Sequence, residues 1–377
     1  MSVNPLLRVG TAAVATLGVL ALSACGSDPE PSGSSSPGGS SSSTGADCPQ
    51  GTLNAEGSSA QKNAIEEVIS KYNEKCADVT VNYNPTGSGA GIKQFIAAQV
   101  DFAGSDSALK TEGKDGAEPE TTQAQKRCGG NPALNLPMVI GPIAIAYNLD
   151  GVAKLVLDGP TAAKIFQGAI KTWNDPAIAK LNAGVTLPSA PISVFFRSDE
   201  SGTTENFTKY LAAAGGGAWT GKPAKKWTGT GAGKEKSAGV AEGVKSTKNS
   251  ITYVEMSYAV DNKLGVAQID NGSGTPVELT ADSAGKALAA AKIKGTGNDL
   301  AMSIDYTTKE AGAYPIILVT YEIACSKGLA AEKTALVKSF LSYFVSKDGQ
   351  GALTALNYGP LPEEIRTKVD AAIQSIS

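Results

Sequence analysis

The sequence predicts an α/β protein in which strands alternate with helices in layers. The runs VTVNYN at 79–84 and PISVFF at 191–196 carry the two-residue apolar period of a strand. Before the first run, AQKNAIEEVISKYNEK at 60–75 places apolar residues at the i, i+3, i+4 and i+7 positions of a helix. Because strand, loop and helix recur in this order, we expect α/β layers with parallel strands. The apolar run VIGPIAIAYN at 139–148 suits a further, buried strand.

The composition excludes several function classes. The chain has 377 residues, with 33 Lys and Arg, 36 Asp and Glu, and no His, so it has no Ser/His/Asp triad and no imidazole metal ligand. Its four arginines, Arg8, Arg127, Arg197 and Arg366, form no basic stripe of the kind that binds nucleic acid. Hydrophobic residues make up 41% of the chain, and single cores stop growing near ~250 to 300 residues. We therefore expect two lobes and no nucleic-acid partner.

Residues 1–24 have the composition of a signal peptide. They contain one basic residue, Arg8, followed by an apolar run that is short for a bilayer-spanning helix of about 20 residues. The run ends in the sequence LSAC, which resembles the lipobox of bacterial lipoproteins and implies lipidation of Cys25. The alternative is an ordinary export signal with an incidental cysteine.

Residues 25–46 have the composition of a flexible tether. The stretch after Cys25 contains nine Ser, five Gly and three Pro, so it buries almost no apolar surface. At ~5 to 6 Å times the square root of its length, such a tether spans roughly 25 Å. We expect it to hold the folded part close to a membrane anchor.

Four cysteines follow the tether, at Cys48, Cys76, Cys128 and Cys325. An even number in an exported chain indicates two disulfides, with three possible connectivities. The preferred pairing is Cys48 with Cys76 and Cys128 with Cys325. A zinc site is a poor alternative because no two of these cysteines are close in sequence and the chain has no histidine.

Four loops rich in Gly, Ser and Thr each fall at a predicted strand-to-helix junction. They are EGSSAQ at 56–61, PTGSGAGIKQF at 85–95, DFAGSDSAL at 101–109 and RSDESGTTENF at 197–207. A helix N-terminus offers unpaired N–H groups and a partial positive charge, and hydroxyls add donors without net charge. Taken singly, each loop is explained as well by an ordinary N-cap. Convergence of several loops on one cleft would make an anion site.

The order of these loops resembles the phosphate-binding protein of Pst-type ABC importers, the PstS family, in its actinobacterial lipoprotein form. The resemblance extends from about residue 51 to residue 365 and continues through four further segments: IKTWNDPAIAKLNAGVTLP at 170–188, FTKYL at 207–211, SITYVEMSYA at 250–259 and YGPLP at 358–362. It implies a two-lobed type II periplasmic solute-binding protein fold with a ligand cleft between the lobes. Residues 47–141 and 313–377 would form lobe 1, and residues 142–312 would form lobe 2.

The same resemblance implies a set of ligand contacts and no cofactor. Carried over by matching motifs, the phosphate contacts fall on Ser59, Ala60, Ser88, Asp106, Arg197, Ser201, Gly202 and Thr203. Ser59 lies where the family often has Thr, which keeps the hydroxyl. Ala60 replaces a frequent aromatic residue, which leaves the backbone N–H in place and alters the packing at that wall.

The chemistry of these residues suits a tetrahedral oxyanion. The guanidinium of Arg197 offers a planar fork of donors for two oxygens. The hydroxyls of Ser88, Ser201 and Thr203 and the backbone N–H of Gly202 add further donors. Charge-assisted hydrogen bonds contribute roughly 1.5 to 3 kcal/mol each, and micromolar binding needs about 8 kcal/mol. A few such bonds are therefore sufficient.

Asp106 is the most informative of these residues because a carboxylate facing an anion repels it. An ionised carboxylate only accepts hydrogen bonds, so it favours a ligand that carries a proton and penalises one that carries none. Phosphate keeps a proton near neutral pH and sulfate does not, so Asp106 predicts selection of phosphate over sulfate. The alternative is a turn or N-cap role in SDSAL.

These observations predict a receptor that is not an enzyme. We expect a monomer, lipid-anchored to the outer face of the plasma membrane, that delivers phosphate to the permease and ATPase subunits of an ABC importer. One alternative is a secreted phosphohydrolase, which needs a nucleophile or metal that the sequence does not offer. Another is a surface adhesion or sensing lipoprotein, for which four such loops are superfluous.

Overall fold

The computed structural model describes residues 48–113 and 116–377. The predicted signal peptide, Cys25 and the tether lie outside the described residues. Within the described part, disulfides join Cys48 to Cys76 and Cys128 to Cys325, the pairing preferred above. No helix in that same part is both long and apolar enough to cross a membrane.

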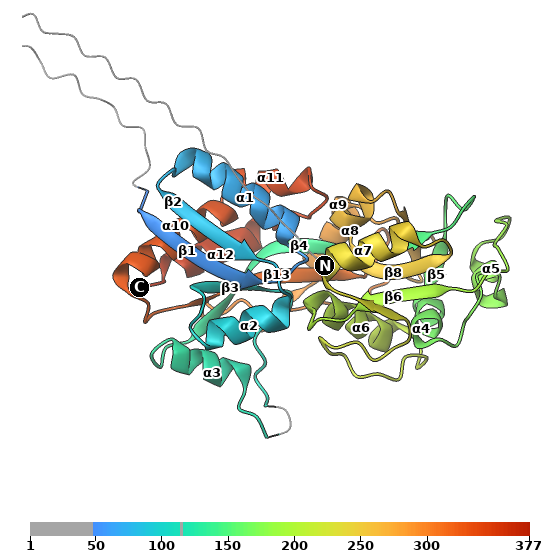
Figure 1. Cartoon of the computed structure of the whole chain (residues 1–377), viewed down its shortest axis with the longest axis horizontal. Helices are drawn as coiled ribbons and strands as arrows, with labels where there is room; N and C mark the ends of the chain where they lie inside the picture. Colours follow the sequence, from blue (N-terminus) through green and yellow to red (C-terminus); the bar gives the residue numbers. More distant parts are fainter. Residues whose placement is uncertain (1–47, 114–115) are drawn as a thin grey trace, which may run out of the picture. The chain divides into compact units, whose positions relative to one another are not determined.

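A nine-stranded mixed sheet runs through the described residues (Figure 1). Its strands, in spatial order, are β2 (Val79–Asn84), β1 (Gly51–Gly57), β3 (Phe102–Ser105), β13 (Ile317–Cys325), β4 (Ala133–Asn148), β8 (Ser250–Glu255), β6 (Ser193–Arg197) and β7 (Ala232–Lys234), with β9 (Gly265–Val266) paired to β4. Strands β2, β1 and β3 are parallel to one another, and so are β8, β6 and β7. Each parallel group therefore has its carboxyl ends at one edge.

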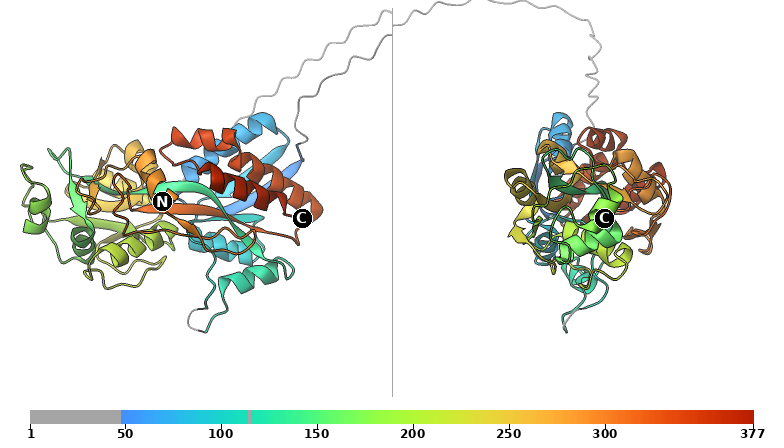
Figure 2. Two further views of the ribbon diagram at one scale, coloured as in Figure 1. Left: turned by 180° about the vertical axis from the view of Figure 1, so that it is seen from behind. Right: turned by 90° about the vertical axis from the view of Figure 1, so that its right-hand side faces the viewer.

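The expectation of parallel strands is wrong for the middle of this sheet. Strand β13 is antiparallel to both β3 and β4, and β4 is antiparallel to β8. Figure 2, seen from behind, shows β4 and β13 as two long strands that connect the two halves. Both strands are buried along nearly their whole length, so they read as continuous apolar runs. Such a run carries no signal of direction, which is decided by the path of the chain.

Helices cover both faces of each half of the sheet (Figure 1). Beside β1, β2 and β3 lie α1 (Lys62–Lys75), α10 (Ala331–Val345) and α11 (Lys347–Thr354) on one face and α2 (Ser88–Ile96) and α3 (Glu120–Arg127) on the other. Beside β6 and β8 lie α7 (Lys236–Ser246) and α8 (Met256–Asp261) on one face and α4 (Gly159–Gln167) and α6 (Gly202–Ala214) on the other. The remaining elements are α5 (Pro176–Leu181), α9 (Ala281–Ala289), α12 (Glu363–Gln374), β5 (Val156–Asp158) paired with β10 (Gln268–Asp270), and β11 (Lys292–Ile293) paired with β12 (Met302–Ser303).

The buried apolar residues of the described chain form two core clusters, called here the first core and the second core. The first core surrounds β1, β2 and β3, and the second surrounds β8, α4 and α6. Strand β4 passes from the first core, which it leaves after Ile140, to the second core, which it enters at Ile143. The sheet is continuous across this point, so the two cores are held together by the long strands themselves.

Three of the four predicted junctions lead directly into helices, namely α1, α2 and α6. The third junction does not, because no described residue between the end of β3 and the start of α3 at Glu120 is helical. The Ser105 hydroxyl donates to the Ser107 carbonyl over 2.7 Å and accepts from the Ser107 N–H over 3.2 Å. Such local bonds compete with helix formation. Asp106 therefore lies in a tight turn and is not a helix N-cap.

Candidate oxyanion-binding site

The four predicted loops meet between the first and second cores. A Cβ atom built on Gly202 would lie 2.5 Å from Ser88 Oγ and 2.7 Å from Asp106 Oδ2, so the second, third and fourth loops are in contact. Ser59 joins the group through the Ser237 hydroxyl, 3.0 Å from its own, and the Ser237 hydroxyl in turn accepts from Arg197. The carboxyl ends of both parallel strand groups thus face each other, which is where ligands bind in open α/β sheets.

Asp106 is the centre of the first-core side of the site. Its side chain is buried, and its Oδ1 accepts hydroxyl hydrogens from Ser58 over 2.6 Å and from Thr320 over 2.8 Å. Its Oδ2 accepts from the Ser88 hydroxyl over 3.0 Å. Burial raises the pKa of Asp106 from 3.8 to about 6, although the hydroxyl bonds oppose the change. The carboxyl is therefore mostly ionised at neutral pH.

Arg197 is the centre of the second-core side. Its guanidinium is buried and forms a two-pronged ion pair with Asp199, in which Nε lies 2.7 Å from Oδ1. The Nη1 group donates to the hydroxyls of Ser237 over 3.1 Å and Thr203 over 3.4 Å. Burial disfavours the charge of Arg197, but Asp199 holds its pKa above the usual value. Arg197 is therefore a permanent cation with a fixed orientation.

The start of α6 supplies the donors between these two centres. The Ser201 hydroxyl caps the helix by accepting from the Thr204 N–H over 3.1 Å. The Thr203 hydroxyl donates to the buried carboxylate of Glu255 over 2.6 Å. Gly202 lies against Ser88 and Asp106 at a distance that no side chain would allow. The N-termini of α6 and of α2, which begins at Ser88, consequently face one another.

Ser59 and Ala60 form the wall between β1 and α1. The Ser59 hydroxyl accepts from the backbone N–H of Ser237 over 3.2 Å. The Ala60 N–H donates to the Ser58 hydroxyl over 3.1 Å, and the Ala60 carbonyl accepts from Tyr358 over 2.6 Å. The backbone N–H that we expected to stay available at Ala60 is therefore committed to Ser58 in this arrangement.

Several residues of the site were missed by sequence reasoning: Ser58, Asp199, Ser237, Glu255 and Thr320. Ser58 and Asp199 stand inside loops that the sequence had singled out, so attention to every hydroxyl and acid of those loops would have found them. Glu255 lies on β8 inside the segment 250–259 that carries part of the family resemblance, whereas the neighbours of Thr320 on β13 and of Ser237 at the start of α7 give no sign of a role. They reach the site only through the fold.

Ion pairs connect the first-core side of the site to the second-core side. Lys93 of α2 pairs with Glu200 over 2.6 Å, and Lys110 pairs with Glu205 of α6. The lysines around Glu205 overcome its burial and lower its pKa to about 2. Each of these pairs links an element beside the first core to one beside the second, so the pairs help to hold the two sides of the site together.

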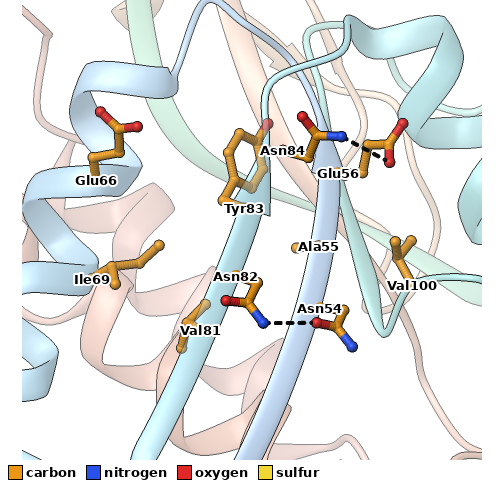
Figure 3. Close-up of a pocket in the computed structure, with 10 residues that line it drawn as sticks. All are labelled: Asn54, Ala55, Glu56, Glu66, Ile69, Val81, Asn82, Tyr83, Asn84 and Val100. Atoms are coloured by element: carbon orange, nitrogen blue, oxygen red, sulfur yellow. Dashed lines mark hydrogen bonds between the residues drawn. The ribbon is translucent and has the colours of Figure 1, made fainter. Parts of the chain in front are cut away.

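Two of the cavities formed by the described residues are relevant to the location of the site. One of about 640 Å³ lies beside the site, between the turn at Asp106 and the α6 residues Glu205 and Asn206. The other, of about 450 Å³, lies at the β2 edge (Figure 3). In the second cavity the Asn82 side-chain amide donates to the Asn54 side-chain oxygen. None of the site residues named above, all of which are described, lines this cavity. The first cavity is therefore the one connected with the candidate site.

The described residues contain no group of three or more His, Cys, Asp or Glu side chains arranged to hold a metal ion. The donors that converge are hydroxyls, backbone N–H groups and one guanidinium. This donor set suits an oxyanion that is bound by hydrogen bonds.

Comparison with known proteins agrees with this geometry. A PBP superfamily domain matches residues 42–348. The chain is 45% identical to phosphate-binding protein PstS 3 of Mycobacterium tuberculosis, covering 98% of this chain and 99% of that protein, and 45% identical to PstS 2 of the same organism, covering 96% of each. The fold is similar to that of a high affinity periplasmic phosphate-binding protein, PfluDING, with a TM-score of 0.70, 23% identity and coverage of 85% and 93%. The chain therefore has the two-lobed periplasmic binding protein fold and belongs to the PstS family of phosphate-binding proteins.

Proposed function

We propose that the protein binds inorganic phosphate between its two lobes and delivers it to an ABC importer. The proposal rests on one observation above all: a buried carboxylate, Asp106, and a buried guanidinium, Arg197, belong to one group of contacting loops that is rich in hydroxyl and N–H donors. The names of the relatives, which are phosphate-binding proteins, support the same ligand.

The proposed contacts are the eight residues predicted from sequence. Ser59, Ser88, Ser201 and Thr203 would donate hydroxyl hydrogens, Ala60 and Gly202 would donate backbone N–H groups, and Arg197 would bind two phosphate oxygens. At present many of these donors bond to one another, as Ser59 does with Ser237. A ligand would replace such bonds, so its oxygens must satisfy every donor that it displaces.

Asp106 would select the ligand. The ionised Asp106 carboxylate accepts from three hydroxyls and has no hydrogen of its own to donate. A phosphate that still carries a proton donates to it, whereas a fully ionised sulfate meets an unpaired negative charge.

The lobes are proposed to be residues 47–141 with 313–377, and residues 142–312. The passage of β4 from the first to the second core between Ile140 and Ile143 supports the first boundary. Three α9 residues, Ala284, Ala287 and Leu288, join the first core although they belong to the second stretch. Opening of the lobes would thus move α9 relative to part of its surroundings.

The protein acts outside the cytoplasm, as PstS-type binding proteins do. We propose in addition that Cys25 carries the lipid that anchors it to the outer face of the plasma membrane, and that the stretch 26–46 tethers it there. Its partners would be the permease and ATPase subunits of the importer, and the protein itself would act as a monomer.

Calorimetric titration with phosphate, arsenate and sulfate tests the ligand. We expect micromolar or tighter binding of phosphate, similar binding of arsenate because it has the same shape and protonation, and weak binding of sulfate. Equal affinity for sulfate would contradict the selection by Asp106, and no affinity for phosphate would contradict the proposed function itself.

Small-angle scattering tests the closing motion. Because both lobes donate to one ligand, the closed state alone makes all the bonds. Phosphate should therefore reduce the radius of gyration, and identical profiles with and without phosphate would refute the motion.

The alternatives have less support. The relatives are named as binding proteins, and the sequence has no histidine, so a phosphohydrolase is not favoured. Incubation with a chromogenic phosphate ester, with and without divalent metal, would detect such an activity. A role in adhesion or sensing would require that deletion of the gene alters surface attachment without reducing phosphate uptake.

A further inference from the structure

A second buried acid, Glu322, lies behind the site and has no part in the proposed contacts. It stands on β13 opposite Gly104 of β3 and is wholly buried. A Cβ atom built on Gly104 would lie 2.2 Å from the Gln61 amide nitrogen and 2.4 Å from the Tyr83 hydroxyl. The space next to Glu322 on that side of the sheet is therefore filled by an amide and a phenol and contains no cation among the described side chains.

The hydrogen bonds around Glu322 are incomplete. Within residues 48–113 and 116–377, neither carboxyl oxygen of Glu322 has a hydrogen-bond partner, and Gln61 Oε1 has none either. An ionised carboxylate in such a position is strongly disfavoured, and burial raises the pKa of Glu322 from 4.5 to about 8. A neutral Glu322 supplies one O–H donor, and Gln61 Oε1 is an acceptor that lacks one.

Two routes connect Glu322 to Asp106. Thr320, which donates to Asp106 Oδ1, precedes Glu322 by two residues on the same strand and therefore points to the same face. The second route begins at Gln61, which lies beside Gly104 opposite Glu322. The Gln61 amide donates to the Tyr83 hydroxyl over 3.0 Å, and Tyr83 donates to the Ser58 carbonyl over 2.7 Å. The Ser58 hydroxyl then donates to Asp106 over 2.6 Å.

The charged and titratable groups that surround Glu322 would not compensate a negative charge on it. Asp106 is itself acidic, and the pKa of Tyr83 is raised well above its usual value by burial and by Glu322, so the phenol stays neutral. Further groups near the same cluster are Glu255, Tyr258 and Tyr358. The nearest cation of the site, Arg197, is already paired with Asp199.

We propose that Glu322 is a positioning residue of the phosphate site, neutral when the ligand binds, and that loss of its proton weakens phosphate binding at alkaline pH. Ionisation would place a second negative charge behind Asp106. It would also turn the Gln61 amide towards the new carboxylate, so the bond from that amide to Tyr83 would be lost. This inference rests on the proposed function.

The test compares phosphate affinity by calorimetry from pH 6.5 to pH 9.5 for the wild-type protein, Glu322→Gln and Glu56→Gln. Glutamine keeps the shape of the neutral acid, so both proteins should bind alike at pH 7. If binding requires the proton, the wild-type protein should bind about tenfold more weakly than Glu322→Gln at pH 9, one unit above a pKa of about 8. The titration of phosphate itself cancels in this ratio.

Glu56→Gln is the matched control, because Glu56 lies on β1, which β3 separates from β13, and its carboxylate accepts from the side chains of Thr86 over 2.7 Å and Asn84 over 3.5 Å. It should follow the wild-type curve at every pH. A ratio of wild-type to Glu322→Gln affinity that does not change with pH would overturn the role of Glu322. Absence of phosphate binding in all three proteins at pH 7 would instead overturn the proposed function.

Infrared spectroscopy of the wild-type protein needs no variant and covers the case in which Glu322→Gln does not fold. The carbonyl band of a protonated carboxyl should be present at pH 7, disappear at pH 9.5 and return at pH 9.5 when saturating phosphate is added. A band that phosphate does not restore would also overturn the proposal.

Discussion

The two sides of the candidate site differ in how a buried charge is compensated. On the first-core side, Asp106 is an acid whose side-chain oxygens are bonded by neutral hydroxyls, among them those of Ser58 and Thr320. On the second-core side, Arg197 is a cation whose charge is matched directly by Asp199. The acid consequently has a raised pKa, whereas the cation is held charged.

The difference shows that net charge is not what attracts an anion here. Against the single guanidinium of Arg197, the site holds the acids Asp106, Asp199 and Glu255, all close to its hydroxyls. Affinity must therefore come from oriented donors and from the exclusion of water, since hydrogen bonds are stronger in a buried site. In the proposed function, the first-core side would contribute selection and the second-core side would contribute attraction.

The largest expected effect is on the second-core side. Arg197→Met removes two charge-assisted hydrogen bonds of roughly 1.5 to 3 kcal/mol each, so phosphate affinity should fall about 100-fold or more. Calorimetric titration measures the loss. Arg366→Met, on the outer helix α12 where Arg366 pairs with Glu363, is the control and should bind as the wild-type protein does. A loss of less than about tenfold in Arg197→Met would mean that the hydroxyls carry the affinity alone.

A smaller effect, on selectivity, is expected on the first-core side. Asp106→Asn supplies an N–H donor where the wild-type protein has only acceptors, so sulfate affinity should rise by about 10- to 100-fold, the penalty of one unpaired buried group. Competition titrations of phosphate against sulfate measure the change. Asp150→Asn is the control, since Asp150 forms an exposed ion pair with Lys248. Unchanged selectivity in Asp106→Asn would reject the role of Asp106.

The same carboxyl predicts a pH dependence. The folded-state pKa of Asp106 is raised to about 6, so the wild-type acid gains its proton as the pH falls through 6 and can then donate to sulfate. Discrimination against sulfate should weaken by up to about tenfold between pH 7 and pH 5. The proton also stabilises the folded state, and this contribution is full below pH 3.8 and is lost as the pH rises through 6. Asp106→Asn should show neither trend.

The smallest effect on phosphate affinity is expected from the exposed ion pair between Lys93 and Glu200. Lys93 is 70% exposed and pairs with Glu200 across the two sides. Exposed pairs contribute roughly 0.2 to 1 kcal/mol, so Lys93→Met should weaken phosphate binding less than about fivefold. High salt should reduce the wild-type affinity to that of Lys93→Met, because salt screens exposed pairs. Lys71→Met, which removes a pair within α1, is the control.

Much of the local structure was predictable because it follows from neighbouring residues. The period of VTVNYN corresponds to β2, and the helical spacing before it in AQKNAIEEVISKYNEK corresponds to α1. The loop at 197–207 begins at the end of β6 and enters α6 through the Ser201 cap. The turn at Asp106 was harder to predict from the sequence, because the serine on either side of it can cap a helix or close a turn with similar hydrogen bonds.

The supporting residues of the site could not be predicted in this way. Thr320 donates to Asp106 across 214 positions of sequence, and Tyr258 donates to the Ser59 carbonyl across 199. Glu322 sits in an apolar strand, where a single acid gives no hint of which group it faces. Neither periodicity nor spacing contains information about such distant pairs.

The sequence by itself determined the kind of chemistry available: no imidazole, little arginine, and four loops in which glycine brings hydroxyls and backbone donors to the ends of strands. These are properties of residue type and of contacts within a few positions. The tertiary structure alone decided that β4 and β13 run antiparallel through the middle of the sheet, and that Ser58, Thr320 and Ser88 surround one carboxylate. The reason is that burial and charge compensation depend on which distant segments pack together, and packing is settled only when the whole chain has folded.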